Sequence, residues 1–338
     1  MINVAIVGGG PAGSYCAYHL AKNDVHPVIF DPTHPREKPC GGLVSPSAQK
    51  MLPFLKEIPI ERRERKTLCI ISPYGKRIRI SSRYSRFLCF SRLELDKFLL
   101  DTAVKEGAEL VEEKVTALTR KGGMWKIKTA KRSYLAKRLV GADGVNSIVR
   151  KSIVGALDSK DKGLCYGYLV EGLEDEEIIL KFLFHRVGYL WVIPRKSHTS
   201  LGIGCANLSR SYGLKKELDI FIKRHYPHVK KNAEWAALIP HIKDIKTLHI
   251  PVAGTDWILI GDAAGHVSPV VGEGIIYALL DGELAAEAIV ENNPKLFNRL
   301  WKETYGWILF RDVKLMKWIS KKPFLELFFQ YLKFRSLV

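Results

Sequence analysis

Three glycine-containing segments, far apart in the chain, have the composition and spacing to hold a phosphorylated cofactor. The first is Gly8-x-Gly10-x-x-Gly13, which lies between the apolar run 4–7 and a helical pattern. Gly8 permits a tight turn, Gly10 lets the backbone approach a pyrophosphate, and Gly13 lets helix and strand pack closely. Asp31 ends the next apolar run, where a carboxylate can bind ribose hydroxyls. This pattern predicts a dinucleotide site but does not separate FAD from NAD.

The second and third segments make that separation. Asp143-Gly144 follows an apolar run and precedes Ser147 and Arg150, while Gly261-Asp262 follows the buried strand expected at 257–260. Gly272-Glu273-Gly274 then opens a helix, whose N-terminus can stabilise negative charge on a reduced flavin ring. Two unrelated turns are the alternative, which the order and spacing disfavour. Together the three segments predict one extended FAD bound to a single domain.

These segments resemble the FAD-binding fold shared by aromatic hydroxylases, flavin halogenases and geranylgeranyl reductases, over roughly residues 1–290. Arg92 matches the family arginine that opens a helix and reaches the cofactor, and a surface charge at a helix start is the alternative. The residues assigned to FAD are Gly8, Gly10, Pro11, Ala12, Gly13, Asp31, Cys40, Gly41, Gly42, Arg92, Val115, Asp143, Gly144, Gly261, Asp262, Pro269, Gly272, Gly274 and Ile275.

Two further segments resemble geranylgeranyl reductases. Pro39-Cys40-Gly41-Gly42 is similar to their Cys-Gly-Gly loop near the flavin, and Tyr189-x-Trp191-x-Ile193-Pro194 with Gly202-x-Gly204 is similar to their aromatic signature. Alternate residues of a strand face the same side, so Tyr189 and Trp191 can line an isoprenoid channel or belong to a sheet core. The assigned substrate-binding residues are Tyr189, Trp191, Ile193, Pro194, Gly202 and Gly204, and the assigned catalytic residues are Cys40, Tyr189 and Trp191.

Two departures from that pattern concern the substrate. The family has Phe where this chain has Ile193, and flavin halogenases carry Trp-x-Trp-x-Ile-Pro at the matching segment. The halogenases' catalytic lysine motif is not recognised here. The C-terminal part is shorter than is typical of geranylgeranyl reductases, which leaves the size of the substrate open.

Cys40 has two interpretations. A thiol beside a flavin can exchange redox state with a partner, and Lys38 nearby favours a thiolate. Alternatively the side chain fills space in a loop where the flanking glycines allow close backbone approach. We do not assign Cys40 as a proton donor.

The predicted fold class is α/β, with a glutathione-reductase-type, Rossmann-like FAD-binding domain, an inserted antiparallel β-sheet substrate domain and a C-terminal helical segment. We expect residues 1–50, 90–160 and 247–294 to form the discontinuous FAD-binding domain. Residues 51–89 and 161–246 are assigned to the substrate domain, and 295–338 to the C-terminal segment.

Charge and composition limit the partners. The 338 residues include 53 Lys and Arg against 35 Asp and Glu, a net charge of +18, which suits anionic lipid or an acidic protein. We find no nucleic-acid motif and expect no nucleic-acid partner. The six cysteines form no CxxC pair, so we expect neither a metal site nor a disulfide framework.

The ends of the chain bear on its location. The N-terminus enters a short strand directly, so we expect no signal peptide, and no uncharged run is long enough to span a bilayer. The aromatic and basic segment 295–338, which Pro323 divides, suits either an interfacial membrane helix or a cap over the substrate domain. We therefore expect a cytoplasmic protein with peripheral contact to the inner face of the membrane.

The function that these patterns favour is FAD-dependent saturation of C=C bonds in geranylgeranyl or other isoprenoid chains of archaeal-type lipids. No second Gly-x-Gly-x-x-Gly segment is found, so the reductant is either transiently bound NAD(P)H or a small acidic carrier such as ferredoxin. A monooxygenase or halogenase of the same fold is the first alternative. A non-catalytic flavin-binding or membrane-binding module is the second.

Overall fold

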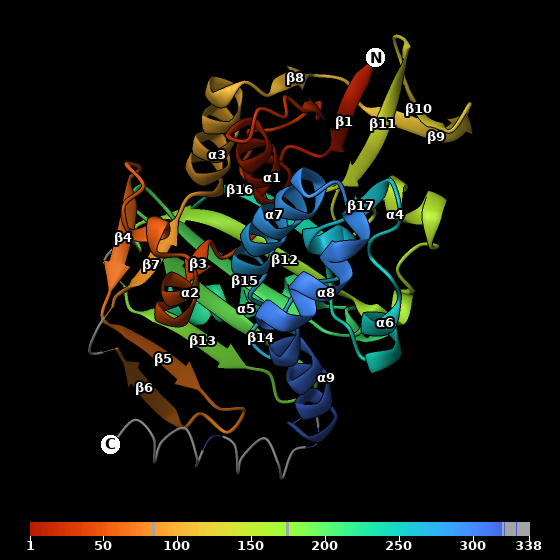
Figure 1. Cartoon of the computed structure of the whole chain (residues 1–338). Helices are drawn as coiled ribbons and strands as arrows, with labels where there is room; N and C mark the ends of the chain where they lie inside the picture. Colours follow the sequence, from red (N-terminus) through yellow and green to blue (C-terminus); the bar gives the residue numbers. More distant parts are fainter. Residues whose placement is uncertain (83–84, 174–175, 320, 322–328, 330–338) are drawn as a thin grey trace. The chain divides into compact units, whose positions relative to one another are not determined.

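The chain folds as two compact units, each assembled from separate stretches of sequence. A computed structural model describes residues 1–82, 85–173, 176–319, 321 and 329 (Figure 1). Unit 1 comprises Met1–Arg36, Leu93–Asp161 and Asp244–Val313. Unit 2 comprises Glu37–Arg92, Lys162–Lys243 and Lys314–Val338. The stretch 37–50, expected with the FAD-binding domain, therefore groups with unit 2.

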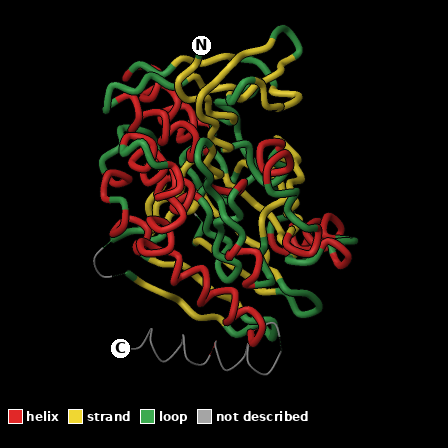
Figure 2. The backbone as a smooth tube through the Cα atoms, turned by 45° about the vertical axis from the view of Figure 1, so that its right-hand side comes forward, coloured by secondary structure: helices red, strands yellow, loops and turns green. Residues whose placement is uncertain are grey.

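Unit 1 is built on a seven-stranded sheet with the order β8-β2-β1-β11-β10-β9, in which β17 also pairs with β11. The strands are β1 (Ile2–Val7), β2 (Val28–Phe30), β8 (Glu109–Val111), β9 (Val115–Lys121), β10 (Met124–Thr129), β11 (Ser133–Gly141) and β17 (Trp257–Leu259). The pairs β1–β2, β1–β11, β2–β8 and β11–β17 are parallel. The hairpins β9–β10 and β10–β11 are antiparallel, and Figure 2 draws the strands of the chain in yellow. The apolar run of β1 is buried on both faces, as in other parallel sheets.

Helices of unit 1 begin where the parallel strands end. Helix α1 (Pro11–Ala21) follows β1 through the glycine turn, and α7 (Ile275–Val290) follows β17 through residues 260–274. The other helices that start in this part of the chain, or at its boundary, are α3 (Arg92–Glu106), α4 (Ile148–Ile153), α6 (Ile245–His249), α8 (Phe297–Trp301) and α9 (Trp307–Ile319). A π-helical turn, Lys302–Gly306, joins α8 to α9.

Unit 2 contains a seven-stranded sheet with the order β16-β12-β15-β14-β13-β5-β6. Its strands are β5 (Thr67–Ile71), β6 (Arg77–Ser81), β12 (Lys162–Glu171), β13 (Ile178–Phe182), β14 (Gly188–Pro194), β15 (Thr199–Cys205) and β16 (Lys230–Pro240). All neighbours are antiparallel except β13 and β5. In a smaller, three-stranded sheet, β7 (Phe87–Phe90) pairs with β3 (Leu43–Val44) and with β4 (Arg62–Arg65). Unit 2 also contains the helices α2 (Pro46–Met51) and α5 (Leu214–His225). The parallel core of the mixed sheet of unit 1 and the largely antiparallel sheet of unit 2 confirm the predicted fold class.

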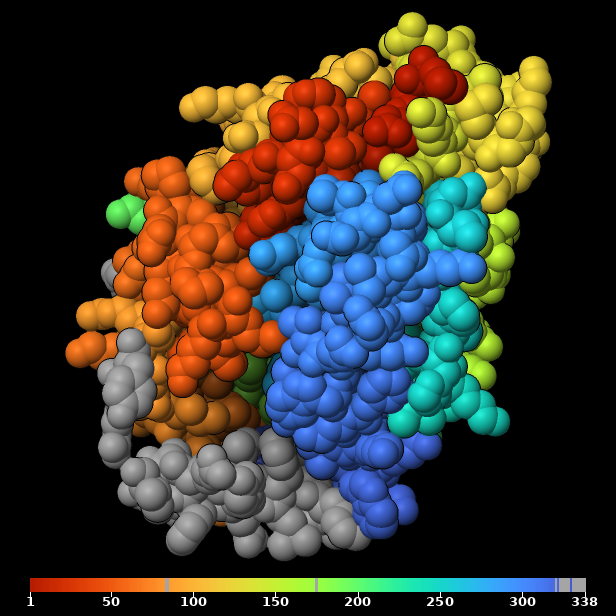
Figure 3. All heavy atoms as spheres, viewed as in Figure 1, coloured from red at the N-terminus to blue at the C-terminus, as the bar shows by residue number. Residues whose placement is uncertain are grey.

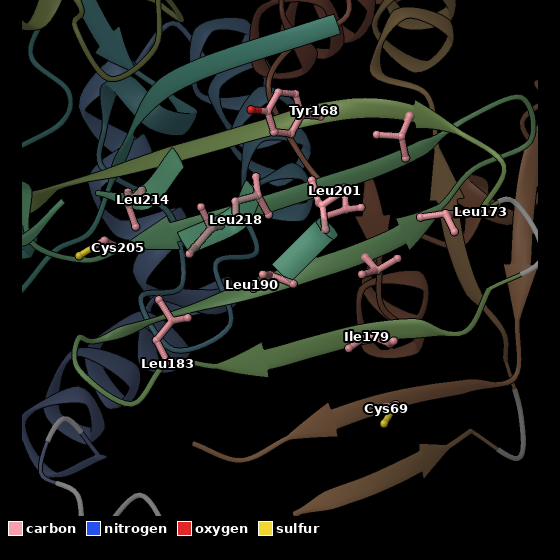
Figure 4. Packing of buried hydrophobic residues seen from close by; sticks show 14 residues of the cluster. Cys69, Tyr168, Leu173, Ile179, Leu183, Leu190, Leu201, Cys205, Leu214 and Leu218 are labelled. Atoms are coloured by element: carbon pink, nitrogen blue, oxygen red, sulfur yellow. The ribbon is translucent and has the colours of Figure 1, made fainter. Parts of the chain in front are cut away.

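The two faces of the unit 2 sheet bury different side chains. Leu190 and Val192 of β14 point to a core that α5 covers with Leu214 and Leu218 (Figure 4). Tyr189, Trp191 and Ile193 alternate with them and point to the opposite core, as predicted from the period of a strand.

The C-terminal segment is described only in part. Trp301 and Tyr305 are buried in unit 1, whereas Trp307 and Trp318 of α9 are more than half exposed. Pro323, which we expected to divide the segment, lies outside the described residues. Over the described part of the chain, no helix is both long enough and apolar enough to cross a membrane.

Candidate functional site

The glycine turn of unit 1 has the backbone shape that its sequence predicted. Gly8 has φ +107°, and a Cβ there would lie 2.3 Å from the Ala142 carbonyl oxygen. A Cβ at Gly13 would lie 1.9 Å from the Gly8 carbonyl oxygen, so neither position accepts a side chain. Gly10 is the N-cap of α1 and supplies no side-chain cap, which leaves the helix N-terminus available to an anion.

The second glycine turn packs directly on the first. Gly261 has φ +60°, and a Cβ there would lie 3.1 Å from the Cβ of Ala12 in α1. Gly274 is the N-cap of α7, again without a side-chain cap, and its Cβ position lies 3.8 Å from Asp262 Oδ1. Figure 3 shows the red atoms of α1 beside the blue atoms of α7. Two uncapped helix N-termini and the half-exposed Asp262 therefore belong to one region of unit 1.

The Asp143 segment joins the two glycine turns. The Asp143 carboxylate accepts hydrogen bonds from Ile148 N (2.7 Å) and Val149 N (3.3 Å) and from the Ser147 hydroxyl. Burial raises the pKa of Asp143, although these hydrogen bonds oppose the shift. Arg150, buried at the end of the segment, donates to the Ala263 carbonyl (3.2 Å). The structure thus brings the three predicted segments together, and Asp143 caps its own helix start, a role that the sequence did not predict.

Asp31 holds the loop that surrounds it. Its carboxylate accepts hydrogen bonds from Gly9 N (2.7 Å), Thr33 N (2.7 Å) and His34 N (2.9 Å), and from His34 Nδ1 (2.8 Å). Burial alone would raise the pKa of Asp31, but His34, Gly9 and Thr33 hold it well below its ordinary value. Both oxygens are thus already engaged with the chain, and the expected contact of Asp31 with ribose hydroxyls stays a prediction.

His34 was not predicted from the sequence. Its Nε2 lies 3.4 Å from Asp96 Oδ2, so the ring bridges Asp31 and Asp96 beside the Gly10 turn. Burial lowers the pKa of His34, but the two carboxylates outweigh burial and the net shift is upward. A basic group held between two acids is not visible in sequence, because Asp96 belongs to helix α3.

A fully buried polar network supports the Gly261 turn from α7. Asp281, in the middle of that helix, accepts a hydrogen bond from Gly261 N (2.7 Å) and from His266 Nδ1 (2.9 Å). The Tyr305 hydroxyl also donates to Asp281 and lies 2.8 Å from His266 Nδ1. Burial, and then the Asp281 carboxylate, raise the pKa of Tyr305 well above its ordinary value, which keeps the phenol protonated as a donor.

Gly282, the next residue, lets the same helix approach α1. A Cβ there would lie 2.8 Å from both Ala12 O and Cys16 N. Asp281 and Gly282 therefore fix α7 against both glycine turns. A single acid within the otherwise apolar start of the helix at 275–282 was the sequence signal that could have identified them.

The Cys-Gly-Gly loop of unit 2 is held by two buried polar side chains, one from the residue that follows β14 and one from β15. The Cys40 carbonyl accepts hydrogen bonds from Arg195 Nη2 (2.7 Å) and Ser200 Oγ (3.0 Å). Arg195 is 1% exposed and also pairs with Glu37. The half-buried Cys40 thiol accepts from Gly42 N (3.3 Å). The sequence predicted this loop but not Arg195 or Ser200, which anchor it.

The aromatic strand lies in contact with that loop. Trp191 Nε1 donates to Ser200 Oγ (3.1 Å), and Ser200 in turn donates to the Cys40 carbonyl. A Cβ at Gly41 would lie 2.5 Å from Ile193 Cδ1, so the loop follows the strand closely. The two segments that resemble geranylgeranyl reductases therefore form one hydrogen-bonded assembly within unit 2.

The glycines of β15 leave space for the Trp191 ring. A Cβ at Gly202 would lie 2.2 Å from that ring and one at Gly204 3.6 Å, so the indole covers both glycines, and their expected contact with substrate stays a prediction. Trp235 of β16, which the sequence did not single out, stacks on Trp191 with centroids 5.9 Å apart. Tyr189 meets Trp191 edge-on at 6.0 Å.

The other predicted positions have these places. Arg92 is buried at the start of α3, and its backbone N–H donates to Glu37 (3.2 Å). Val115 begins β9, Ile275 begins α7, and Pro269 and Pro194 are buried. Gly144 and Gly272 both have positive φ, as their turns require.

The region built from the three segments of unit 1 fits FAD. Its two glycine turns exclude side chains, and both helices start without a side-chain cap, which together suit the close approach of a pyrophosphate. The half-exposed Asp262 beside the start of α7 suits hydroxyl groups of a ribityl chain.

Comparisons with known proteins agree with this architecture. A family model described as NAD(P)-binding Rossmann-like domain matches residues 6–46. The chain is similar to an uncharacterised protein of Methanosarcina barkeri, at 31% identity over 94% of this chain and 83% of the relative. It is similar to a digeranylgeranylglycerophospholipid reductase of Methanocaldococcus jannaschii, at 26% identity over 94% of this chain and 87% of the relative.

Two solved structures show the same fold. One is a geranylgeranyl bacteriochlorophyll reductase-like protein from Thermoplasma acidophilum, with a TM-score of 0.80 and 22% identity over 96% of this chain and 87% of that one. The other is a triple mutant of the flavin-dependent brominase Bmp2, with a TM-score of 0.78 and 19% identity over 96% of this chain and 90% of that one. The fold, the site and these relatives together define an FAD-dependent oxidoreductase.

Within that class, the chain belongs to the geranylgeranyl reductase family of flavoproteins.

Proposed function

We propose that this flavoprotein saturates C=C bonds in the isoprenoid chains of lipids. The single observation that carries the proposal is the hydrogen-bonded assembly of Cys40, Ser200 and Trp191. It supports the proposal because it joins the two segments that resemble those of geranylgeranyl reductases.

The side chains of unit 2 suit an apolar, extended substrate. Tyr189 and Trp235 are each half-buried and edge the core that contains Trp191 and Ile193. Flat aromatic surfaces bind isoprenoid units through dispersion and burial, without a demand for polar groups. Ser200 and the glycines beneath Trp191 hold the indole in one orientation, which is the preorganisation that an unactivated alkene requires.

The chemistry requires FAD and an external donor. When bound, FAD would supply the hydride chemistry for one alkene carbon, the other carbon would need a proton, and the electrons would come from NAD(P)H or from a small acidic carrier. In unit 1 the chain's own part is to present two helix N-termini, where negative charge is stabilised. In unit 2 its part is to bind the alkene and exclude water.

The resemblance to halogenases gives a second candidate, an FAD-dependent monooxygenase or halogenase acting on a small apolar substrate. Ile193 is the halogenase residue at its position, and the brominase shares the fold at a TM-score of 0.78. Such an enzyme consumes O₂ and leaves the lipid alkene intact, so the two candidates differ in a measurable product.

The test is an anaerobic single turnover. We would reduce the purified flavoprotein with dithionite, add a geranylgeranylated phospholipid, and follow flavin reoxidation by absorbance and the lipid by mass spectrometry. Reoxidation together with a lipid that gains hydrogens in pairs is the expected result. Flavin that stays reduced until air is admitted, with unchanged lipid, would overturn the proposal in favour of the oxygen-using candidate.

A matched pair of variants tests whether the activity depends on the aromatic cluster of Tyr189, Trp191 and Trp235. Trp191→Phe removes the indole that stacks on Trp235, whereas Trp307→Phe alters an indole that is 59% exposed in unit 1. We expect Trp191→Phe to slow lipid-dependent reoxidation at unchanged FAD content and Trp307→Phe to leave it unchanged. If the two variants changed the rate of lipid-dependent reoxidation equally, the activity would not depend on this aromatic cluster.

A further inference from the structure

One face of helix α5 carries exposed apolar and basic side chains at helical spacing. Lys216, Ile220 and Lys223 recur every three to four residues, and Tyr212, two residues before the helix begins, lines the same surface. Tyr212 is 95% exposed and Ile220 is 58% exposed. Tyr212, Lys216, Ile220, Lys223 and Arg224 are here named the α5 face.

The opposite side of the helix explains why these residues remain outside. Leu214, Leu218 and Ile222 are buried against the unit 2 sheet, which satisfies the apolar stripe that the helix needs in order to fold (Figure 4). Tyr212 and Ile220 are thus not required for folding. An exposed aromatic and an exposed aliphatic residue within one patch indicate a binding surface.

The charge of the α5 face is positive and unopposed. Among the described residues, no ion pair is found for Lys216, Lys223 or Arg224. The two acids of the helix are engaged elsewhere, Glu217 with Arg186 (3.3 Å) and Asp219 with Lys231 (2.7 Å).

The titration of His225, at the end of the helix, agrees with a positive field. Burial and then the charges of Lys181, Arg224 and Arg77 lower its pKa. His225 is therefore predominantly neutral at neutral pH, and the positive charge of the face comes from its lysines and Arg224.

The shape of the face suits a shallow partner. A hollow that is open to solvent is lined by Tyr212, Gly213, Lys215, Lys216, Ile220 and Lys223, and by Asp219, the acid that pairs with Lys231. Protein–protein interfaces are depleted in Lys, whereas helices that lie in the membrane interface combine Lys and Arg with aromatic and aliphatic residues. Long lysine side chains can reach lipid phosphates while their methylene stems cover apolar surface.

We propose that the α5 face docks on the surface of an anionic lipid bilayer. Tyr212 and Ile220 enter the headgroup region, and Lys216, Lys223 and Arg224 pair with lipid phosphates. The inference goes beyond the proposed reaction, because it concerns the bilayer rather than the alkene and needs no bound substrate.

The test measures binding of the oxidised full chain to vesicles by sedimentation. Vesicles of phosphatidylcholine with phosphatidylglycerol are compared with vesicles of pure phosphatidylcholine, at low and high salt. Each basic residue near an anionic surface strengthens binding roughly fivefold, so Lys216→Gln/Lys223→Gln is expected to weaken binding roughly 30-fold. Tyr212→Ser/Ile220→Ser is expected to weaken it at both salt concentrations, since the apolar contact is not screened.

The control is Lys121→Gln/Lys131→Gln, which removes the same charge from exposed lysines in the hairpins of unit 1. This control should bind like the parent chain, and thermal unfolding and FAD content verify that all variants fold. Equal binding by all variants, or no preference for the anionic vesicles, would overturn the proposal. The proposal would also be overturned if the α5 variants bound vesicles normally but their flavin were no longer reduced by an acidic electron carrier. That result would assign the α5 face to a protein partner. Because no turnover is measured, failure here leaves the proposed reaction untouched.

Discussion

Removing the Tyr305 hydroxyl tests whether the buried network under the Gly261 turn supports the FAD-binding unit. Tyr305→Phe keeps the ring but deletes a donor to Asp281, whose side chain is fully buried and has no access to replacement water. A hydrogen bond to a charged group contributes about 1.5–3 kcal/mol. We therefore expect the free energy of unfolding to fall by about 1.5–3 kcal/mol, measured by urea denaturation with and without FAD.

A second substitution in the same network sharpens the test. The neighbours of Asp281 are all donors, namely Gly261 N, His266 Nδ1 and the Tyr305 hydroxyl. Asp281→Asn replaces one acceptor oxygen by an amide donor, so at least one of these groups loses its partner, at a cost of about 1–3 kcal/mol for each buried donor left unsatisfied. The hydrogen bond from Gly261 N to Asp281 is then weakened or lost. The dissociation constant of FAD, measured by flavin fluorescence, should therefore rise more in Asp281→Asn than in Tyr305→Phe.

The matched control is Tyr74→Phe, because Tyr74 is 61% exposed. Its free energy of unfolding should stay within about 0.5 kcal/mol of the parent. The explanation would be refuted if Tyr305→Phe unfolded with the same free energy as Tyr74→Phe. It would also fail if Asp281→Asn were no less stable than Tyr305→Phe.

Three further predictions concern other parts of the two units. Gly282→Ala places a Cβ against the backbone of α1 and should abolish FAD retention during purification, read from the flavin-to-protein absorbance ratio. His34→Gln should remove a pH dependence of the free energy of unfolding. The pKa of His34 is raised in the fold, so its stabilising contribution is complete below about pH 6.5 and is lost as the pH rises through the folded pKa. The pKa of Asp31 is lowered, so its contribution is present above about pH 4. Ser200→Ala leaves the buried Trp191 Nε1 without its acceptor and should cost about 1–3 kcal/mol in the free energy of unfolding and slow lipid-dependent flavin reoxidation.

Each of these has its own control and contradicting result. Gly75→Ala, whose Cβ meets nothing within 4 Å although φ is +86°, controls for strain alone, and normal FAD content in Gly282→Ala would contradict the packing argument. For His34→Gln, a stability that falls above about pH 6.5 as in the parent would exclude the histidine as the cause. Ser159→Ala, an exposed serine, controls for Ser200→Ala, and equal stability of the two would mean that the hydrogen bond to Trp191 is dispensable.

Local patterns were sufficient to predict the elements of the site. The apolar run and glycine spacing at 4–13 predicted β1, the turn and α1, because backbone conformation at glycine and the burial of a parallel strand are local properties. The alternation Tyr189, Trp191 and Ile193 predicted one shared face for the same reason. The family resemblance likewise rests on short contiguous motifs, and it is confirmed by the relatives.

The tertiary structure alone decided which side chains hold those elements in place. Arg195 and Ser200 reach Cys40 across 155 and 160 positions of sequence, and Asp281 of α7 meets Tyr305 of the π-helical turn across 24 positions. An isolated polar residue in an apolar segment does not reveal its hydrogen-bond partner, because a buried hydrogen bond forms only when two segments distant in sequence pack together in one geometry. Sequence thus determined the motifs and the faces of this protein, and the packing of distant segments determined the buried polar contacts that position them.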